Sequence, residues 1–306
     1  MNISINENSG LKWPARLKMG DKAALIAPAS PASEDSLNDA VASLKFLGLV
    51  PEIYPSCHMK YGYLAGSDED RATDINKAFA DDSIKAVFCL RGGYGTPRLL
   101  NLLDYDMIAC HPKVFCGYSD ITALHTVFNK KCGFVTFHSP MPSAGYHKMD
   151  YISLDSIASA IFGKPCDISL QNPYGQKIEK ICGGTASGIL TGGNLSLLLS
   201  TLGSPHAVDT TGKILFIEEV DEELYKVDRA LTALSNAGLF SHASGVILGS
   251  FSGCKRTNST EDSLTLTQVF TDVLGSLCIP VISGFCAGHK YPNLTLPLGA
   301  EITLSV

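Results

Sequence analysis

The chain has 306 residues, of which 45% are hydrophobic and 18% are charged, and its formal net charge is −6. This length supports a sizeable core and exceeds the usual size of one domain, so we expect two domains. The composition is that of an ordered globular protein and excludes long disordered tails. Lysine and arginine are scattered along the chain and are outnumbered by acidic residues, 24 to 30, which argues against a nucleic-acid partner.

Ten cysteines are present, but none forms a Cys-x-x-Cys pair, and no group of His, Cys and carboxylate residues has the spacing of metal ligands. We therefore expect reduced cysteines and neither a metal nor a cofactor. The amino terminus lacks the basic start and apolar stretch of a signal peptide, and no segment reaches membrane-spanning length. These features predict a soluble, cytoplasmic protein that has no membrane partner.

The first half alternates short apolar runs with helical patterns, which is typical of a parallel sheet covered by helices. In chain order we expect strand 22–27, helix 34–47, strand 51–54, helix 68–79, strand 84–90, helix 97–103, strand 114–116, helix 120–129 and strand 133–137. The sequence thus predicts an N-terminal α/β domain over residues 1–165, built on a doubly wound, mainly parallel sheet.

Apolar periodicity weakens after residue 150, and prolines, asparagines and a glycine follow, so we place a linker at 166–182. The remaining residues, 183–306, predict a strand-rich C-terminal α/β domain. Its expected elements are helix 195–202, strand 214–217, helix 223–237 and strands 246–249, 281–283 and 301–306.

Cys-Gly-Tyr-Ser-Asp at 116–120 is the most informative motif. An apolar strand stops at a glycine and a serine and then turns into a helix, as in a strand-to-helix turn that exposes a nucleophile. Ser119 is the candidate nucleophile. The pattern is incomplete because Ile121 stands where such an elbow has a glycine, and Ser119 as a helix N-cap is the structural alternative.

A glycine cluster, Arg91-Gly-Gly-Tyr-Gly at 91–95, follows the strand that ends at residue 90. It fails the dinucleotide fingerprint because Arg98 occupies the position of the third glycine. Since parallel strands end at one edge of a sheet, backbone N–H groups of Gly92 and Gly93 should emerge beside Ser119. A second cluster at 192–194 is more easily explained as a tight turn.

The best candidates for a base and an acid lie in the second half. His289 follows an apolar run in a glycine-containing loop that could present an imidazole to a cleft, whereas His125, six residues after Ser119, should point away from it. Glu218 ends a strand that should be buried on both faces, where a charge is seldom accidental. The acids after Glu218, such as Glu223, fit a solvated helix start.

Five motifs in one order, from about residue 17 to residue 304, resemble the LD-carboxypeptidases, a family of serine peptidases that includes microcin immunity proteins. The matching segments are Arg91-Gly-Gly-Tyr-Gly, Gly117-Tyr-Ser-Asp, Gly192-Gly-Asn-Leu, Glu218-Glu-Val-Asp-Glu with Tyr225 and Arg229, and Gly288-His289. The resemblance implies a Ser-Glu-His triad of Ser119, Glu218 and His289. It places the serine in the N-terminal domain and the other two residues in the C-terminal domain, so the expected active site lies at the interface of the two domains. It also implies a murein tetrapeptide substrate, cleaved before its terminal D-alanine during cell-wall recycling, and a homodimer.

For the oxyanion hole we predict the backbone N–H of Asp120 together with that of Gly92 or Gly93. Arg91 is a candidate for holding the substrate carboxylate or, equally, the glycine loop. Three alternatives stay open at this point. They are a microcin-type immunity hydrolase acting on a peptidyl or aminoacyl nucleotide, a non-catalytic ligand-binding protein, and a cysteine hydrolase using Cys116 or Cys286. A nucleotide substrate would favour an aromatic platform, and the single tryptophan, Trp13, lies outside the predicted site.

Overall fold

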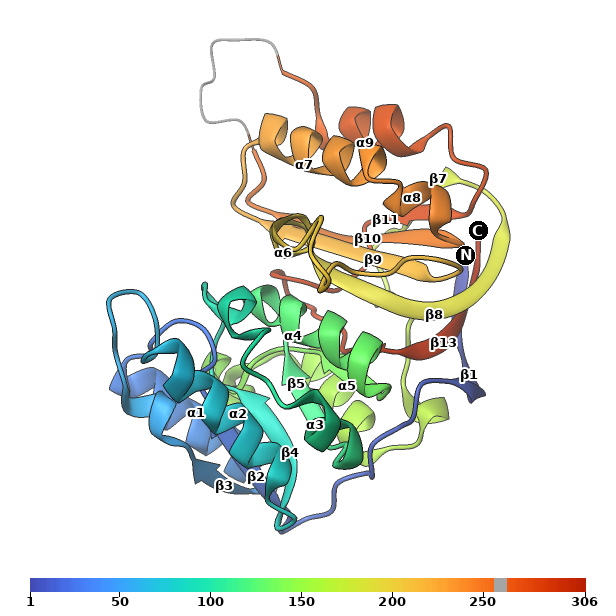
Figure 1. Cartoon of the computed structure of the whole chain (residues 1–306). Helices are drawn as coiled ribbons and strands as arrows, with labels where there is room; N and C mark the ends of the chain where they lie inside the picture. The colour runs from blue at the N-terminus through green and yellow to red at the C-terminus, as the bar shows by residue number, and fades with distance from the viewer. Residues whose placement is uncertain (256–262) are drawn as a thin grey trace.

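The computed structural model describes residues 1–255 and 263–306 and contains two β-sheets, one from each half of the fold (Figure 1). The N-terminal half forms the lower layers in that view, and the C-terminal half lies above it. No helix in these two ranges is both long and apolar enough to cross a membrane. The predicted two-part α/β architecture is confirmed.

The N-terminal sheet has six strands in the order β12-β6-β5-β4-β2-β3, and all neighbours are parallel except β12 and β6. The strands span Lys22–Ile26 (β2), Val50–Ile53 (β3), Ile84–Cys89 (β4), Val114–Gly117 (β5), Thr136–His138 (β6) and Leu296–Leu298 (β12). The parallel part has the strand order of the flavodoxin-like doubly wound fold. In such sheets ligands bind outside the carboxyl ends of the strands.

Helices cover both faces of this sheet (Figure 1). They span Glu34–Phe46 (α1), Asp68–Ala80 (α2), Tyr105–Cys110 (α3), Thr122–Val127 (α4) and Tyr151–Phe162 (α5). Alternate residues of β2 face opposite layers, because Leu25 belongs to the buried cluster that includes α1 and α5, whereas Ile26 belongs to the one that includes α2, α3 and α4. Strands buried on both faces explain why their sequences are continuous apolar runs.

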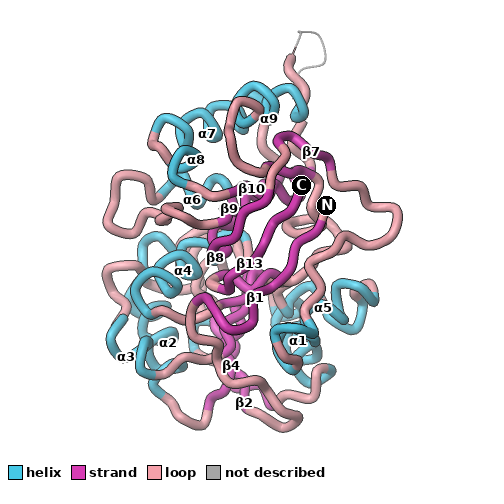
Figure 2. Tube along the Cα trace, turned by 90° about the vertical axis from the view of Figure 1, so that its right-hand side faces the viewer, coloured by secondary structure: helices cyan, strands magenta, loops and turns pink. Residues whose placement is uncertain are grey.

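The C-terminal sheet has seven strands in the order β1-β13-β8-β9-β10-β11-β7, and β8, β9, β10 and β11 are parallel. The strands span Asn2–Gly10 (β1), Glu179–Cys182 (β7), Thr185–Asn194 (β8), Ile214–Val220 (β9), Gly245–Ser252 (β10), Val281–Ser283 (β11) and Ala300–Ser305 (β13). The helices span Leu195–Ser200 (α6), Leu224–Asn236 (α7), Leu239–His242 (α8) and Leu266–Leu274 (α9). Figure 2 shows helices on both sides of the N-terminal sheet, whereas the helices α6 to α9 lie on one side of the C-terminal sheet.

Each sheet contains a strand from the far end of the chain. β1 pairs with β13, with Ile3 opposite Leu304, and β12 pairs with β6, with Leu296 opposite His138. The segment 166–182, which we expected to be a linker, contributes β7 to the C-terminal sheet, where it pairs with β11. The exact domain boundaries stay a prediction.

Short helical turns complete the secondary structure. Turns of 3-10 type lie at Pro55–His58, Thr96–Leu99, Ser119–Ile121, Pro142–Ala144, Tyr146–Lys148 and Pro165–Asp167, and a π-turn lies at Phe128–Cys132. The helix expected at 97–103 is therefore only a 3-10 turn, and a regular helix begins later, at Tyr105, after an Asp104 N-cap. The regular helix starts where Asp104 caps it, because the Asp104 side chain accepts a hydrogen bond from the N–H of Met107.

Candidate active site

Ser119 lies in a strained turn at the carboxyl end of β5. Its φ angle is +64°, a left-handed conformation that residues other than glycine seldom adopt and that often marks a functional site. A β-carbon at Gly117 would lie 2.9 Å from Cγ1 of Ile121. Gly117 thus leaves room for Ile121, the residue that replaces the expected elbow glycine. The N-cap of α4 is Ile121, so the alternative interpretation of Ser119 as a helix cap is wrong.

The glycine loop 91–95 packs directly against this turn. A β-carbon at Gly92 would lie 3.0 Å from Cβ and 3.1 Å from Oγ of Ser119, so a side chain there would press against the nucleophile. Gly93 has a φ of +117°, and Ser30 occupies the space where its side chain would be. Arg91 is exposed and donates a hydrogen bond of 3.2 Å to the carbonyl of Pro31, which ties the loop to the segment after β2.

Three backbone donors around Ser119 are available to a ligand. Among the hydrogen bonds within the described parts of the chain, none uses the N–H of Gly92, Gly93 or Asp120. The Asp120 carboxylate is buried and accepts a hydrogen bond of 2.8 Å from the N–H of Thr96, while the Thr96 hydroxyl donates to the Asp120 carbonyl. Burial raises the pKa of Asp120. The Asp120 side chain therefore fastens the nucleophile turn to the glycine loop.

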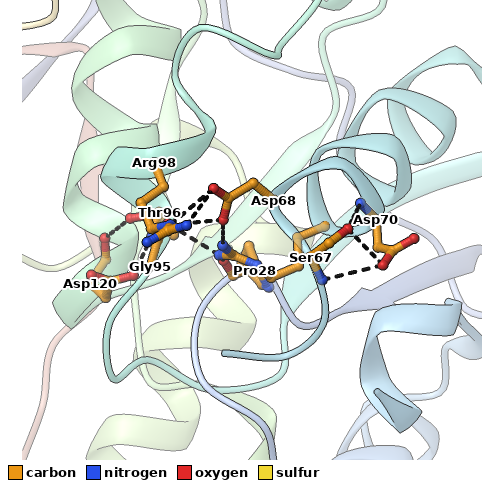
Figure 3. A network of polar contacts seen from close by, with 9 residues as sticks. Pro28, Ser67, Asp68, Asp70, Gly95, Thr96, Arg98 and Asp120 are labelled. Atoms are coloured by element: carbon orange, nitrogen blue, oxygen red, sulfur yellow. Dashed lines mark hydrogen bonds and ion pairs between the residues drawn. The ribbon is translucent and has the colours of Figure 1, made fainter. Parts of the chain in front are cut away.

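A network of polar contacts that includes Asp68, Gly95 and Asp120 supports the same loop (Figure 3). Arg71 of α2 is 0% exposed and donates to the carbonyls of Pro28 and Gly95, the latter at 3.1 Å, and it forms an ion pair with Asp68. Arg98 completes the network by donating to Asp68 at 2.8 Å. The hydrogen bond from Arg98 lowers the pKa of Asp68. Because Gly95 has no side chain, the guanidinium can reach its carbonyl.

Glu218 and His289 form a hydrogen-bonded pair. Glu218 lies near the carboxyl end of β9 and is 0% exposed, and its Oε2 lies 2.6 Å from Nδ1 of His289, whose side chain is 16% exposed. Desolvation raises the pKa of Glu218, and the hydrogen bond from His289 opposes this shift. A carboxylate acceptor at Nδ1 keeps the proton on that nitrogen and leaves Nε2 free as a base.

The loop that carries His289 is held in place by both halves of the fold. Gly288 has a φ of +124°, and a β-carbon there would lie 2.8 Å from Oε2 of Glu218. Its N–H donates to Oδ1 of Asn293 at 3.0 Å, and the N–H of Asn293 donates to Oγ of Ser153 in α5 at 2.8 Å. Helix α5 thereby fixes the position of a loop that belongs to the C-terminal sheet.

Tyr118 connects the serine turn to the histidine. Its ring centroid lies 4.7 Å from that of His289, so the residue before Ser119 touches the imidazole. Within the described ranges no hydrogen bond joins Ser119 directly to His289. The sequence did not predict a role for Tyr118. Its position between Gly117 and Ser119, directly before the candidate nucleophile, could have indicated one.

The second glycine cluster is a contact between the two halves rather than only a tight turn. The N–H of Asn194 donates to Oγ1 of Thr122 in α4 at 2.9 Å, and a β-carbon at Gly193 would lie 2.4 Å from that oxygen. The buried Glu219 carboxylate accepts hydrogen bonds from the Asn194 side chain at 2.9 Å and from the Ser196 hydroxyl at 2.6 Å. Glu219 thus differs from the solvated acids of a helix start and holds the beginning of α6.

Other histidines and cysteines near Ser119 are poorly placed for catalysis. His125 and His138 are fully buried, and burial lowers the pKa of His125 to about 4. His125 bonds through Nε2 to the carbonyl of Gly117, and thus lies behind the turn. Burial raises the pKa of the Cys116 thiol to about 12 and also raises that of Cys286, which disfavours thiolate chemistry. No group of residues in the described ranges could hold a metal ion.

Two family models match the chain. The LD-carboxypeptidase N-terminal domain matches residues 23–139, and the LD-carboxypeptidase C-terminal domain matches residues 187–304. The chain belongs to the LD-carboxypeptidase family. The resemblance inferred from the five motifs is confirmed, and membership supports a serine peptidase.

Named relatives are similar over nearly the whole chain. A probable murein peptide carboxypeptidase of Bacillus subtilis is 40% identical over 95% of this chain and 91% of its own length. The murein tetrapeptide carboxypeptidase of Pseudomonas aeruginosa is 31% identical over 92% of both chains. Among solved structures, an MccF-like protein from Bacillus anthracis is 28% identical, with a TM-score of 0.81 over 96% of this chain and 99% of that one.

Proposed function

We propose that this LD-carboxypeptidase hydrolyses the bond to the terminal D-alanine of murein tetrapeptides through an acyl-enzyme. The observation that carries the proposal is the Glu218–His289 pair, 2.6 Å apart, beside the strained turn of Ser119. The murein peptide carboxypeptidases named among its relatives support the substrate class. We further propose a cytoplasmic enzyme of cell-wall recycling that acts as a homodimer.

In the proposed mechanism His289 is the general base. Its Nε2 takes the proton of the Ser119 hydroxyl as Oγ attacks the scissile carbonyl, and it then donates that proton to the leaving amine of D-alanine. Glu218 holds the imidazole through Nδ1 and stabilises its charged form. Water activated by His289 hydrolyses the acyl-enzyme in the second half of the cycle, which regenerates Ser119.

The oxyanion would be bound by the N–H of Asp120 and by that of Gly92 or Gly93. The absence of other partners for these donors in the described hydrogen bonds supports this role, since a preorganised oxyanion hole needs free N–H groups. Tyr118 is proposed as a positioning residue, because its ring contacts the His289 imidazole and it directly precedes Ser119 in the chain. Arg91 stays a candidate for the terminal carboxylate of the substrate.

The direct test is release of D-alanine from a murein tetrapeptide, free or attached to its disaccharide, followed by mass spectrometry. We expect release by the wild type and a loss of about 10⁴-fold or more with Ser119→Ala, the scale of removing a triad nucleophile. Cys116→Ser is the matched control, and its kcat should stay near that of the wild type. No release by the wild type, or unchanged release by Ser119→Ala, would refute the proposal and favour a non-catalytic binding protein.

One observation favours the microcin-type alternative as a second candidate. Tyr94 in the glycine loop and Tyr63 are exposed, and their rings lie 6.0 Å apart, so they form an aromatic surface on which a base could stack. Trp13, by contrast, packs against Phe137 in the N-terminal half. An aminoacyl-adenylate analogue offered in the same assay separates the candidates. Faster hydrolysis of the analogue than of the tetrapeptide would favour the immunity hydrolase.

A further inference from the structure

A cavity of about 640 Å³ lies beside the catalytic pair, at the carboxyl ends of β10 and β11. Its lining includes Ser250, Ser252 and Lys290, the residue that follows His289. Ser250 Oγ lies 2.4 Å from the β-carbon position of Gly288, a position that is itself 2.8 Å from Oε2 of Glu218. Ser250, which lines the cavity, therefore lies near Glu218, and Lys290 is next to His289 in the chain.

The chemistry of the lining differs from that of the protein as a whole. The chain is acidic, yet the described residues that line the cavity include Lys177 and Lys290 and no aspartate or glutamate. Among the described residues, the hydroxyl oxygens of Ser250 and Ser252 have no hydrogen-bond partner, but both oxygens are buried and neither is exposed to the cavity. The two lysines therefore carry the polar side of the cavity, which suits an anion rather than a cation.

The wall that carries Lys177 is built into the fold. The side-chain amide of Asn172 donates to the carbonyl of Gly284 at 2.8 Å and accepts from the N–H of Cys286 at 2.8 Å. A β-carbon at Gly284 would lie 2.8 Å from the carbonyl of Lys177, so glycine permits the close contact of the two segments. Both segments line the cavity, and Asn172 fixes their separation.

An apolar side faces this polar one. Phe251 and Phe270 pack edge to face with centroids 4.9 Å apart, and Phe285 and Tyr291 also line the cavity. A volume of this size is within the range of small-molecule sites, roughly 300–1,000 Å³. The cavity suits a group that combines an aliphatic stem with a carboxylate.

We propose that the cavity is a subsite for a carboxylate carried by the peptide on the acyl side of the scissile bond. Lys177 and Lys290 supply the positive charge and donate hydrogen bonds to the carboxylate. Tyr118 of the nucleophile turn contacts His289, and the next residue, Lys290, lines the cavity, so the cavity adjoins the site where the scissile carbonyl would lie. An extended peptide spans about 3.3–3.6 Å per residue, which lets the acyl side of the substrate extend from Ser119 towards this cavity. This inference rests on the proposed function, because it places a peptide at Ser119.

The test uses two tetrapeptides ending in D-alanine, one with a free carboxylate on its second residue and the other with a carboxamide there. Calorimetry with Ser119→Ala measures binding without turnover. We expect the acid to bind about tenfold more tightly than the amide, the usual scale of a charge-assisted hydrogen bond. Adding Lys177→Gln and Lys290→Gln should make the two affinities equal. Lys45→Gln, an exposed lysine of α1, is the matched control and should keep the preference.

The outcomes separate the two proposals. Equal binding of the acid and the amide by Ser119→Ala, or no binding of either, overturns the subsite. A preference that survives the double lysine substitution also overturns it. If the preference exists and depends on the lysines, but the wild type releases no D-alanine, then the subsite stands and the proposed hydrolysis fails.

Discussion

Replacing Glu218 by glutamine tests whether the buried carboxylate stabilises charge on His289 during catalysis. Oε2 lies 2.6 Å from Nδ1. At an effective dielectric constant of about 20, two unit charges at that separation attract by about 6 kcal/mol, which corresponds to four to five powers of ten in rate. Glutamine keeps part of this through its dipole, so we expect kcat to fall by about 10³–10⁴-fold with little change in KM.

The assay is steady-state release of D-alanine by Glu218→Gln and by Glu222→Gln. Glu222 pairs with Lys226 at 3.3 Å near the surface, and its substitution should leave kcat within about twofold of the wild type. A Glu218→Gln enzyme whose kcat stays within tenfold of the wild type would refute the reasoning.

Glu218→Gln should raise the stability of the fold, although it lowers kcat. Burial raises the folded-state pKa of Glu218 above its ordinary value of 4.5, so the native state binds this proton more tightly than the unfolded chain does. The free energy of unfolding therefore decreases as the pH rises from 4.5 through the folded-state pKa of Glu218. Above that pKa the carboxyl group is ionised in both states, and the cost of burying its charge is fully present. We expect Glu218→Gln to melt at a higher temperature than the wild type at about pH 7.5, with a smaller difference at about pH 4. A lower Tm than the wild type at the higher pH contradicts this expectation.

Two further substitutions test the support of the nucleophile. Gly92→Ala places a methyl group 3.0 Å from Cβ of Ser119. We therefore expect kcat to fall by about 10–100-fold and the free energy of unfolding to fall by about 1–3 kcal/mol. Unchanged kinetics would show that the loop does not constrain Ser119. Asp68→Asn removes the partner of the fully buried Arg71 and should lower the unfolding free energy, measured in urea, by about 3 kcal/mol. Asp82→Asn, at an exposed carboxylate, is the control and should change the free energy of unfolding by less than about 0.5 kcal/mol. Equal losses in the two variants would contradict the idea that Asp68 stabilises the fold through Arg71.

Local sequence patterns predicted the N-terminal sheet well because its strands are buried on both faces and read as apolar runs. The strand at Asn2–Gly10 was not expected, since it is polar at many positions and lies at a sheet edge. Its partner, β13, is almost the whole chain length away. Two strands so far apart in the chain leave no pattern in the local sequence that predicts their pairing. The same reason explains why the pairing of β12 with β6 in the N-terminal sheet was not predicted.

The site was predictable in part. Small residues around Ser119 indicated a sharp turn, and the φ of +64° agrees with it. The pairing of Glu218 with His289 joins residues 71 positions apart. Their strand end and glycine-containing loop made each a candidate, and the resemblance to a known family joined them with Ser119 in one triad. Burial of Glu219 was not foreseen, because its hydrogen-bond partners, Asn194 and Ser196, belong to another strand-to-helix turn.

The exchange of edge strands bears on how the chain can be divided. A cut within 166–182 would leave the amino-terminal fragment holding β1, a strand of the opposite sheet, while the other fragment would keep β12, a strand of the first sheet. Each fragment alone would expose an unpaired sheet edge, which invites aggregation. The two fragments together would complement each other, so a nicked enzyme should remain one particle and the halves should unfold in a single cooperative step. An insertion or fusion meant to keep activity must therefore preserve β1 and β13 in the C-terminal sheet and β12 in the N-terminal sheet.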